Sequence, residues 1–294
     1  MTHPAGPPPY PSQGPAAVCV RHPDRATGLS CVRCGRPSCP ECLREASVGF
    51  QCVDCVGRSD QGVRRATTVA GAEQVATRRR PLVVWALVAL NVAVYAWTVV
   101  QAGSISDNYR SALFEAWQLA PKQVADGDWW RILTSGFLHI GPLHIASNMF
   151  ALWVLGRDME TVLGRGRFLA LYMISLIGGS AAVVVFNAPG QPVAGASGAV
   201  FGLMGGLLVV LLRLKRPVGQ VVGLIAINVV ISQVVPGISL TAHIGGLVVG
   251  VLVAAALVYT PARNRTPLQV GALSGITVVL LAVIAVVATT IPTP

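Results

Sequence analysis

The chain has 294 residues, of which 53% are hydrophobic and only 12% are charged, and its formal net charge is +10. A mean hydropathy of +0.63 excludes an ordinary soluble domain and indicates a membrane protein with several spans. Positive charge gathers before residue 81 and in short loops, so we attribute it to membrane topology and contact with anionic lipid. No nucleic-acid partner is expected.

A cysteine-rich segment follows a Pro-rich stretch, residues 1–18, that is expected to be a disordered tail. All seven cysteines lie in this segment, and with one histidine they form four pairs with two-residue spacers: Cys19 with His22, Cys31 with Cys34, Cys39 with Cys42, and Cys52 with Cys55. These eight ligands suffice for two tetrahedral zinc sites, one with three cysteines and a histidine and one with four cysteines. A disulfide framework is not expected, because cytoplasmic thiols stay reduced.

The spacing of these pairs resembles that of B-box-type zinc fingers, in which two zinc ions are held by interleaved pairs. The resemblance implies that the first and third pairs share one metal ion and that the second and fourth pairs share the other. We therefore expect a double zinc-binding module at 19–60, followed by a basic linker at 61–80. The partner we consider for this module is a cytoplasmic protein. The spacing of the pairs does not by itself assign the module a function.

Seven apolar runs follow the linker, and a membrane-spanning helix needs about 20 mostly apolar residues. The predicted spans are 82–100, 143–156, 168–187, 197–214, 218–235, 241–259 and 270–291. The second is short, so we expect it to begin below the membrane surface or to extend towards Glu160. No cleavable signal peptide is expected, because the first apolar run begins only at residue 82.

The orientation follows from the positive-inside rule, which counts lysine and arginine in the short loops beside each span. Basic residues flank alternate ends of the spans: Arg78, Arg79 and Arg80; Arg157, Arg165 and Arg167; Arg213, Lys215 and Arg216; Arg263 and Arg265. The opposite loops 187–196 and 236–241 carry no basic residue. The sequence therefore predicts a multi-pass protein of the cell membrane with a cytoplasmic amino terminus and an extracytoplasmic carboxyl terminus.

A serine and a histidine open two of these spans at a similar depth near the outer face. Ser197 follows Gly195, and His243 precedes the pair Gly245 and Gly246. Serine is a weak nucleophile without an adjacent base, and histidine suits that role near neutral pH. The alternative role for Ser197 alone is that of a small packing residue, and the alternative role for His243 alone is hydrogen bonding between helices. Their joint occurrence on glycine-rich helices that can approach closely favours a catalytic pair.

No aspartate or glutamate occurs between residues 161 and 294. Only loop acids such as Asp126 or Asp128 could complete a triad, so the sequence favours a Ser-His dyad. His144 and Asn148, four residues apart on one helical face, would supply oxyanion donors together with the backbone N–H of Ser197. The alternative role for Asn148 is hydrogen bonding between helices.

Together these motifs closely resemble those of the rhomboid intramembrane serine proteases, over about residues 82–259. The matching elements are Trp130-Arg131, His144-x3-Asn148, Gly195-x-Ser197-Gly198 and Ala242-His243-x-Gly245-Gly246. The resemblance implies Ser197 as nucleophile, His243 as general base and acid, and His144 with Asn148 as oxyanion donors. It also implies that Phe201 packs beneath the His243 ring.

The sequence thus predicts an all-α polytopic membrane protein. Its expected parts are a six-helix rhomboid-like catalytic core at 81–260 and an additional transmembrane helix at 261–294, preceded by the small zinc-stabilised domain. Two functions remain open. The first is a serine endopeptidase that cleaves membrane-anchored proteins near the outer face, with structural zinc and no cofactor for catalysis. The second is a non-catalytic relative that binds and escorts transmembrane helices.

Overall fold

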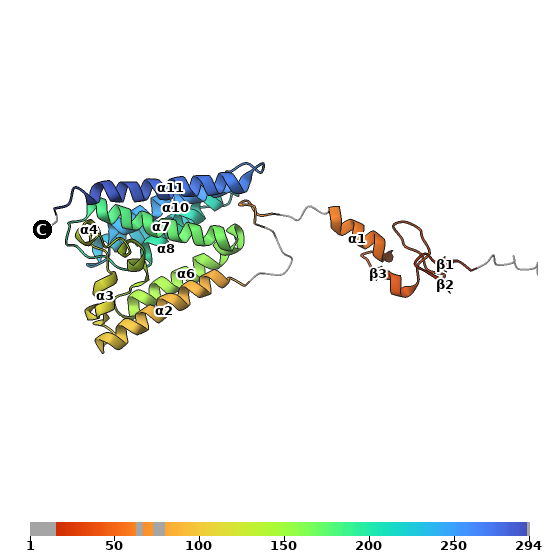
Figure 1. Cartoon of the computed structure of the whole chain (residues 1–294), viewed down its shortest axis with the longest axis horizontal. Coiled ribbons are helices and arrows are strands. Elements are labelled where there is room, and N and C mark those ends of the chain that lie inside the picture. Colours follow the sequence, from red (N-terminus) through yellow and green to blue (C-terminus); the bar gives the residue numbers. More distant parts are fainter. Residues whose placement is uncertain (1–15, 63–66, 73–79, 293–294) are drawn as a thin grey trace, which may run out of the picture. The chain divides into compact units, whose positions relative to one another are not determined.

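The computed structural model describes residues 16–62, 67–72 and 80–292. The chain divides into two compact units, Met1–Arg65 and Ala66–Pro294, which are considered separately (Figure 1). Most of the predicted Pro-rich tail, residues 1–15, lies outside the described residues, as do residues 63–66 and 73–79 of the predicted linker.

The first unit contains two small antiparallel hairpins and one helix. Strand β1 (Val18–Cys19) pairs with β2 (His22–Ala26), and β3 (Leu43–Glu45) pairs with β4 (Phe50–Cys52), which leads into α1 (Val53–Gly62). Its two buried clusters consist of cysteines and a single leucine. A domain this small buries too little apolar surface to be stable alone, so it needs another source of stability, such as a bound metal ion.

The second unit is helical. Its long helices are α2 (Leu82–Ala102), α6 (Gly141–Leu163), α7 (Arg165–Phe186), α8 (Ser197–Arg213), α9 (Gly219–Val234), α10 (Leu240–Val258) and α11 (Arg265–Ala288). Short helices α3 (Ala112–Trp117), α4 (Pro121–Ala125) and α5 (Arg131–Thr134) lie in the long connection between α2 and α6. In Figure 1, α2 runs beside α6, and α11 lies along α7.

All seven predicted spans correspond to helices. Among the described residues, α2, α7, α10 and α11 are long and apolar enough to cross a membrane. A fifth candidate combines α6 with the preceding helical segment Arg131–Phe137, from which it is bent by 97°. Helices α8 and α9 are shorter, at 17 and 16 residues.

For the second span, predicted at 143–156 with an extension towards Glu160 as one alternative, the structure shows the extension: α6 runs from Gly141 to Leu163. The added carboxyl-terminal turns contain charged residues that lower the hydropathy of the segment. One of them, Glu160, is buried and has a specific partner, whereas Arg157 lies over the Trp153 ring. The helix ends where Gly164 adopts a positive φ of 79°.

Glu160 caps the start of α2 from a different helix. The residue before α2, Pro81, provides no side-chain cap. The backbone N–H groups of Val83 and Val84 instead donate to the two carboxylate oxygens of Glu160, at 3.2 and 2.9 Å. The first N–H groups of a helix have no partner within it, so this carboxylate satisfies two of them and also complements the helix dipole.

We expect Glu160→Ala to lower the free energy of unfolding by about 1–3 kcal/mol, because the buried N–H of Val84 and the partly buried N–H of Val83 lose their acceptor. Unfolding of the detergent-solubilised protein by increasing dodecyl sulfate, followed by circular dichroism, would measure the change. Asp158→Ala is the matched control, because its side chain is 64% exposed and on the same helix. Equal stability of the two variants would contradict this role for Glu160.

Helices α7, α8 and α10 meet backbone to backbone through glycine. A Cβ atom on Gly246 would collide with the carbonyl of Gly198, and one on Gly250 would collide with that of Gly202. A Cβ on Gly245 would lie 2.6 Å from the carbonyl oxygen of Gly178. Such small faces allow apolar helices to approach closely, which fixes α10 against α8 at the level of Ser197.

Residues 67–72, within the predicted linker, pack against the helices of the second unit. The hydroxyl of Thr68 donates to the carbonyl of Val162 at 2.6 Å, and Ala70 is fully buried. The side-chain nitrogen of Gln269, in the first turns of α11, donates to the backbone carbonyls of both Ala70 and Leu257. Residues 67–72 thus join the start of α11 to the carboxyl-terminal ends of α6 and α10.

Candidate active site and metal centres

Ser197 is the first residue of α8 and is half-buried. Gly195 just before it has a φ of 133°, which disfavours any other residue, and its N–H donates to the carbonyl of Ser135 at 2.9 Å. The chain therefore turns sharply into the helix. The hydroxyl lies at a helix amino terminus, where free backbone N–H groups can stabilise negative charge.

His243 lies in the first turns of α10 and is 5% exposed. Its ring stacks on Phe201 of α8, with centroids 4.1 Å apart and an interplanar angle of 16°, which confirms the predicted packing. The contact of Gly246 with Gly198 holds the two helices together here. In this structure the Ser197 hydroxyl forms no hydrogen bond with His243, whose Nδ1 instead pairs with Ser232 Oγ at 2.6 Å. Catalytic hydrogen bonds are often long before substrate binds.

The hydrogen bonding of His144 determines which ring nitrogen carries the proton. The backbone N–H of Ile140 donates to Nδ1 at 3.2 Å, so a neutral ring is protonated on Nε2. A Cβ atom on Gly195 would lie only 2.8 Å from that Nε2 and 3.7 Å from the Ser197 hydroxyl oxygen. His144 thus presents an N–H donor beside the residue predicted as the nucleophile.

Asn148 is buried one turn further along α6. Its side-chain nitrogen donates to the carbonyl of His144 at 3.0 Å, which uses one of its two N–H groups within its own helix. The second N–H of this nitrogen has no acceptor among the described residues. Both residues predicted as oxyanion donors therefore share one face at the start of α6.

Neither loop acid considered for a triad contacts His243. Asp126 lies 3.9 Å from the Lys122 ammonium, and Asp128 accepts from Arg131 Nε at 2.8 Å. Arg131 also donates to the carbonyls of Glu115 and Gln118, so it ties the long loop together. The geometry thus leaves the predicted dyad without a carboxylate partner.

Asn108, which the sequence did not indicate, holds the start of α6 in place. It is fully buried, its nitrogen donates to the carbonyl of His139 at 2.7 Å, and its oxygen accepts from the N–H of Gly141 at 2.9 Å. These bonds fix the turn that precedes His144. No periodicity or spacing distinguishes this asparagine from any other in a loop.

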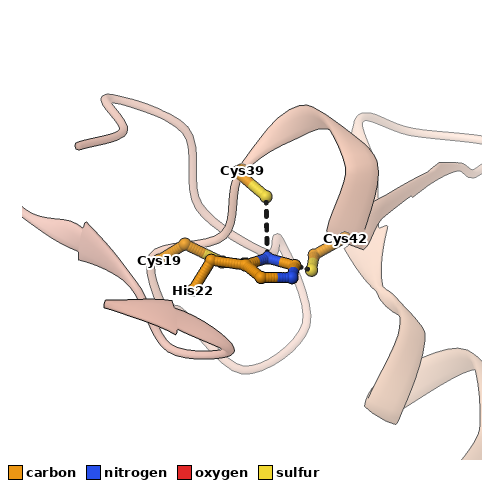
Figure 2. A group of neighbouring side chains, drawn as sticks. All are labelled: Cys19, His22, Cys39 and Cys42. Carbon is orange, nitrogen blue, oxygen red and sulfur yellow. Dashed lines mark hydrogen bonds between the residues drawn. The ribbon is translucent and has the colours of Figure 1, made fainter. Parts of the chain in front are cut away.

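The cysteine pairs of the first unit come together in the interleaved order. Two groups of four side chains have ligand atoms within 4.8 Å of one another: Cys19, His22, Cys39 and Cys42, and Cys31, Cys34, Cys52 and Cys55. Figure 2 shows the first group, with the sulfur atoms of Cys39 and Cys42 close to the His22 ring. The chain therefore has two clusters that could each hold a metal ion.

The spacing of these ligand atoms fits zinc. In a tetrahedral site with Zn–S bonds of about 2.3 Å, neighbouring ligand atoms lie about 3.5–3.8 Å apart. In the first cluster, His22 Nδ1 lies 3.8, 3.4 and 3.3 Å from the sulfurs of Cys19, Cys39 and Cys42. The second cluster has a Cys34 to Cys52 sulfur distance of 3.8 Å. The histidine would bind through Nδ1, a detail that sequence spacing cannot give.

The protein environment also favours thiolates at part of each cluster. Hydrogen bonds from backbone N–H groups, chiefly that of Cys39, lower the pKa of Cys19 to about 6. Hydrogen bonds from backbone N–H groups, chiefly that of Cys52, likewise lower the pKa of Cys31 to about 6. Burial raises the pKa of Cys42 to about 11 and that of Cys55 to about 12. A nearby divalent cation would offset that cost, since the thiolate is the ligand form.

A family model matches part of the second unit in sequence. The family model of the Rhomboid domain matches residues 126–261, which include Ser197 and His243. Rhomboid protease GluP of Bacillus subtilis is 44% identical over 139 residues, which cover 46% of this chain and 27% of GluP. The chain thus aligns with about a quarter of that relative.

Two further relatives are matched over more of their length. The putative rhomboid protease YdcA of Bacillus subtilis is 35% identical over 134 residues, which cover 44% of this chain and 67% of YdcA. Rhomboid protease AarA of Providencia stuartii is 28% identical over 211 residues, which cover 61% of this chain and 73% of AarA. With its apolar helices and the matched domain, this chain is a multi-pass membrane protein that belongs to the rhomboid family.

Proposed function

We propose that this protein is an intramembrane serine endopeptidase that uses Ser197 as nucleophile and His243 as base. The observation that carries the proposal is the contact between α8 and α10, where Gly246 meets the Gly198 carbonyl and Phe201 stacks on His243. This contact brings the histidine to the amino-terminal end of the helix that begins with Ser197. The Nε2–H donor of His144 lies beside Gly195, close to the serine.

The reaction would proceed in two acyl-transfer steps. Ser197 Oγ attacks the scissile carbonyl carbon while its proton passes to His243, and the oxyanion is held by donors from His144, Asn148 and the Ser197 amide. His243 then returns the proton to the departing amine, and the peptide bond breaks to leave an acyl-enzyme. Water, deprotonated by His243, hydrolyses this ester and frees Ser197.

In this proposal the amino terminus and the zinc module lie in the cytoplasm and the end of α11 lies outside the cell membrane, and the basic residues that flank alternate ends of the spans support this orientation. The proposed site then lies near the outer face of the bilayer. Its substrates are transmembrane proteins that enter from the lipid. In this proposal the core is 81–260, the segment 261–294 adds the seventh span, and the two metal ions are structural zinc with no part in catalysis.

Labelling with a fluorophosphonate tests the proposal directly. An activated serine displaces fluoride from the phosphorus, passes its proton to the histidine and remains covalently phosphonylated. We expect the purified full chain to be labelled once, with the label mapped by mass spectrometry to Ser197. Failure to label, or a label on another serine, would favour the alternative of a non-catalytic protein that binds and escorts transmembrane helices.

The site also predicts which substrates are cut. A stable helix hides its carbonyls in i to i−4 hydrogen bonds and must unwind before attack. Glycine costs a helix about 1 kcal/mol and proline about 3 relative to alanine, so we expect substrates with such residues near the outer end of their span. We also expect a small residue at the cleaved bond, because Gly195 and Gly198 lie between closely packed helices.

A single-span reporter with alanine at the cleavage position and Gly-Pro downstream should be cut faster than two matched reporters. One of these has phenylalanine at the cleavage position, and the other has an all-leucine span. Cleavage would be measured in proteoliposomes by gel shift. If all three were cut at one rate, this selectivity would be refuted.

A further inference from the structure

Helix α9 contributes one buried polar side chain to the surroundings of His243. Among the residues of α9, only Val221 and Ser232 are buried. Ser232 is 5% exposed, whereas its neighbour Ile231 is 43% exposed and Val234 is 69% exposed. On this mostly apolar helix, the Ser232 hydroxyl lies 2.6 Å from Nδ1 of His243.

The Ser232 hydroxyl has two partners but only one proton. It lies 2.6 Å from the carbonyl oxygen of Asn228 and 2.6 Å from His243 Nδ1. A carbonyl can only accept a hydrogen bond, so the hydroxyl proton must be directed at Asn228 if both contacts are hydrogen bonds. The Ser232 oxygen then accepts from His243, whose proton must be on Nδ1.

This arrangement leaves Nε2 of a neutral His243 without a proton. Nε2 is therefore the nitrogen able to take the proton of Ser197, as the proposed function requires. His144 has the opposite tautomer, because its Nδ1 accepts from the Ile140 N–H and its Nε2 carries the proton. The two histidines are thus set as a base and a donor by their hydrogen-bond partners.

We propose that Ser232 is a positioning residue that fixes the tautomer and ring orientation of His243, the role that a carboxylate has in a serine-histidine-aspartate triad. The inference rests on the proposed function of His243. Phe201 supports one face of the ring, and Ser232 fixes its edge. The chain has no acidic residue after Glu160, and the loop acids Asp126 and Asp128 are paired with Lys122 and Arg131.

If Ser232 had only a structural role, its bond to the Asn228 carbonyl would be enough, and the loss of its hydroxyl would not affect catalysis. Serine and threonine in apolar helices commonly bond the carbonyl one turn earlier, which satisfies the hydroxyl without any further purpose. Thr277 on α11 is such a residue, with its hydroxyl 2.9 Å from the carbonyl of Leu273. Thr277→Ala is therefore the matched control for Ser232→Ala, since both changes remove a hydroxyl and its i−4 bond from an apolar helix.

The kinetic test compares the full-length variants on one cleavable reporter. Loss of one hydrogen bond to the ring should lower kcat of Ser232→Ala about three- to tenfold and leave KM within about twofold. Ser232→Thr retains the hydroxyl and should keep kcat within about twofold of the unaltered protein, as should Thr277→Ala. An unchanged kcat in Ser232→Ala, or equal losses in the alanine and threonine variants, would overturn the inference.

A spectroscopic measurement separates this inference from the proposed function. Nitrogen-15 spectra of the histidine-labelled full chain in detergent report which ring nitrogen is protonated, and the spectrum of His243→Ala assigns the signals. We expect Nδ1–H at His243, and a mixture of tautomers in Ser232→Ala. A neutral His243 protonated on Nε2 would overturn the inference even in an active enzyme. An inactive protein with the expected tautomer would instead count against the proposed function.

Discussion

Ser197→Ala and His243→Ala should each reduce cleavage of a transmembrane reporter by at least about 1,000-fold, because neither partner works without the other. The double variant should be no less active than either single variant, since the two residues act as one unit. Rates would be measured with purified full-length protein in proteoliposomes. Both variants should remain folded and inserted, because Ser197→Ala removes only a hydroxyl and His243→Ala leaves a cavity beside Phe201.

A control distinguishes lost chemistry from lost structure. Ser147 lies on α6 near the predicted oxyanion donors, but its exposed hydroxyl bonds only to the carbonyl of His144 in its own helix. Ser147→Ala should therefore keep nearly full activity in the same assay. Substantial cleavage by either Ser197→Ala or His243→Ala would rule out the dyad.

Removal of zinc should unfold the cysteine-rich unit. Metal-binding free energy is folding free energy in such small domains. We expect the intact chain to bind about two zinc ions and Cys31→Ser to bind about one, with faster proteolysis of residues 19–62. Elemental analysis and limited trypsin digestion would measure both effects. Ser38→Ala is a control within the same unit, because its hydroxyl donates to the Arg36 carbonyl and touches no cluster sulfur.

Proteolytic activity should survive in the Cys31→Ser protein, since the two units are compact on their own. A truncated enzyme is a second check, and the structure decides where to cut. A chain that begins at residue 81 would lose the contacts of Thr68 and Ala70 with the helices, so a chain that begins at residue 66 is the better choice. Absence of zinc from the intact protein, or an inactive residue 66–294 chain, would contradict these expectations.

The helices could be predicted from sequence because a spanning helix is defined by an uninterrupted apolar run. At α6 the apolar run ends before the helix does, because charged residues lie inside the last turns of the helix. Glu160 lowers the local hydropathy, yet it is buried because it caps α2, and no sequence pattern reports a cap from a different helix. The docking of residues 67–72 was missed for a similar reason, since Gln269, which bonds the Ala70 carbonyl, lies 199 residues further along the chain.

The chemical groups of the candidate site were predictable, but their proton positions were not. Motif spacing indicated Ser197, His243 and His144 because each motif occupies one helix end. Ser232 was not indicated, because a serine in an apolar span is common and its contact with His243 depends on how α9 packs. The use of Nδ1 by His22 depends likewise on the fold of the hairpins around it.

The length of α9 affects the surrounding bilayer. Sixteen residues span about 24 Å at 1.5 Å per residue, which is shorter than a hydrocarbon core of about 30 Å. Most of α9 is exposed, so the lipid beside it must thin by several ångströms, at a cost of a fraction of a kcal/mol for each ångström. The bilayer is thus deformed most beside the helix that holds Ser232. Thicker membranes should increase this mismatch and strain the contact between Ser232 and His243.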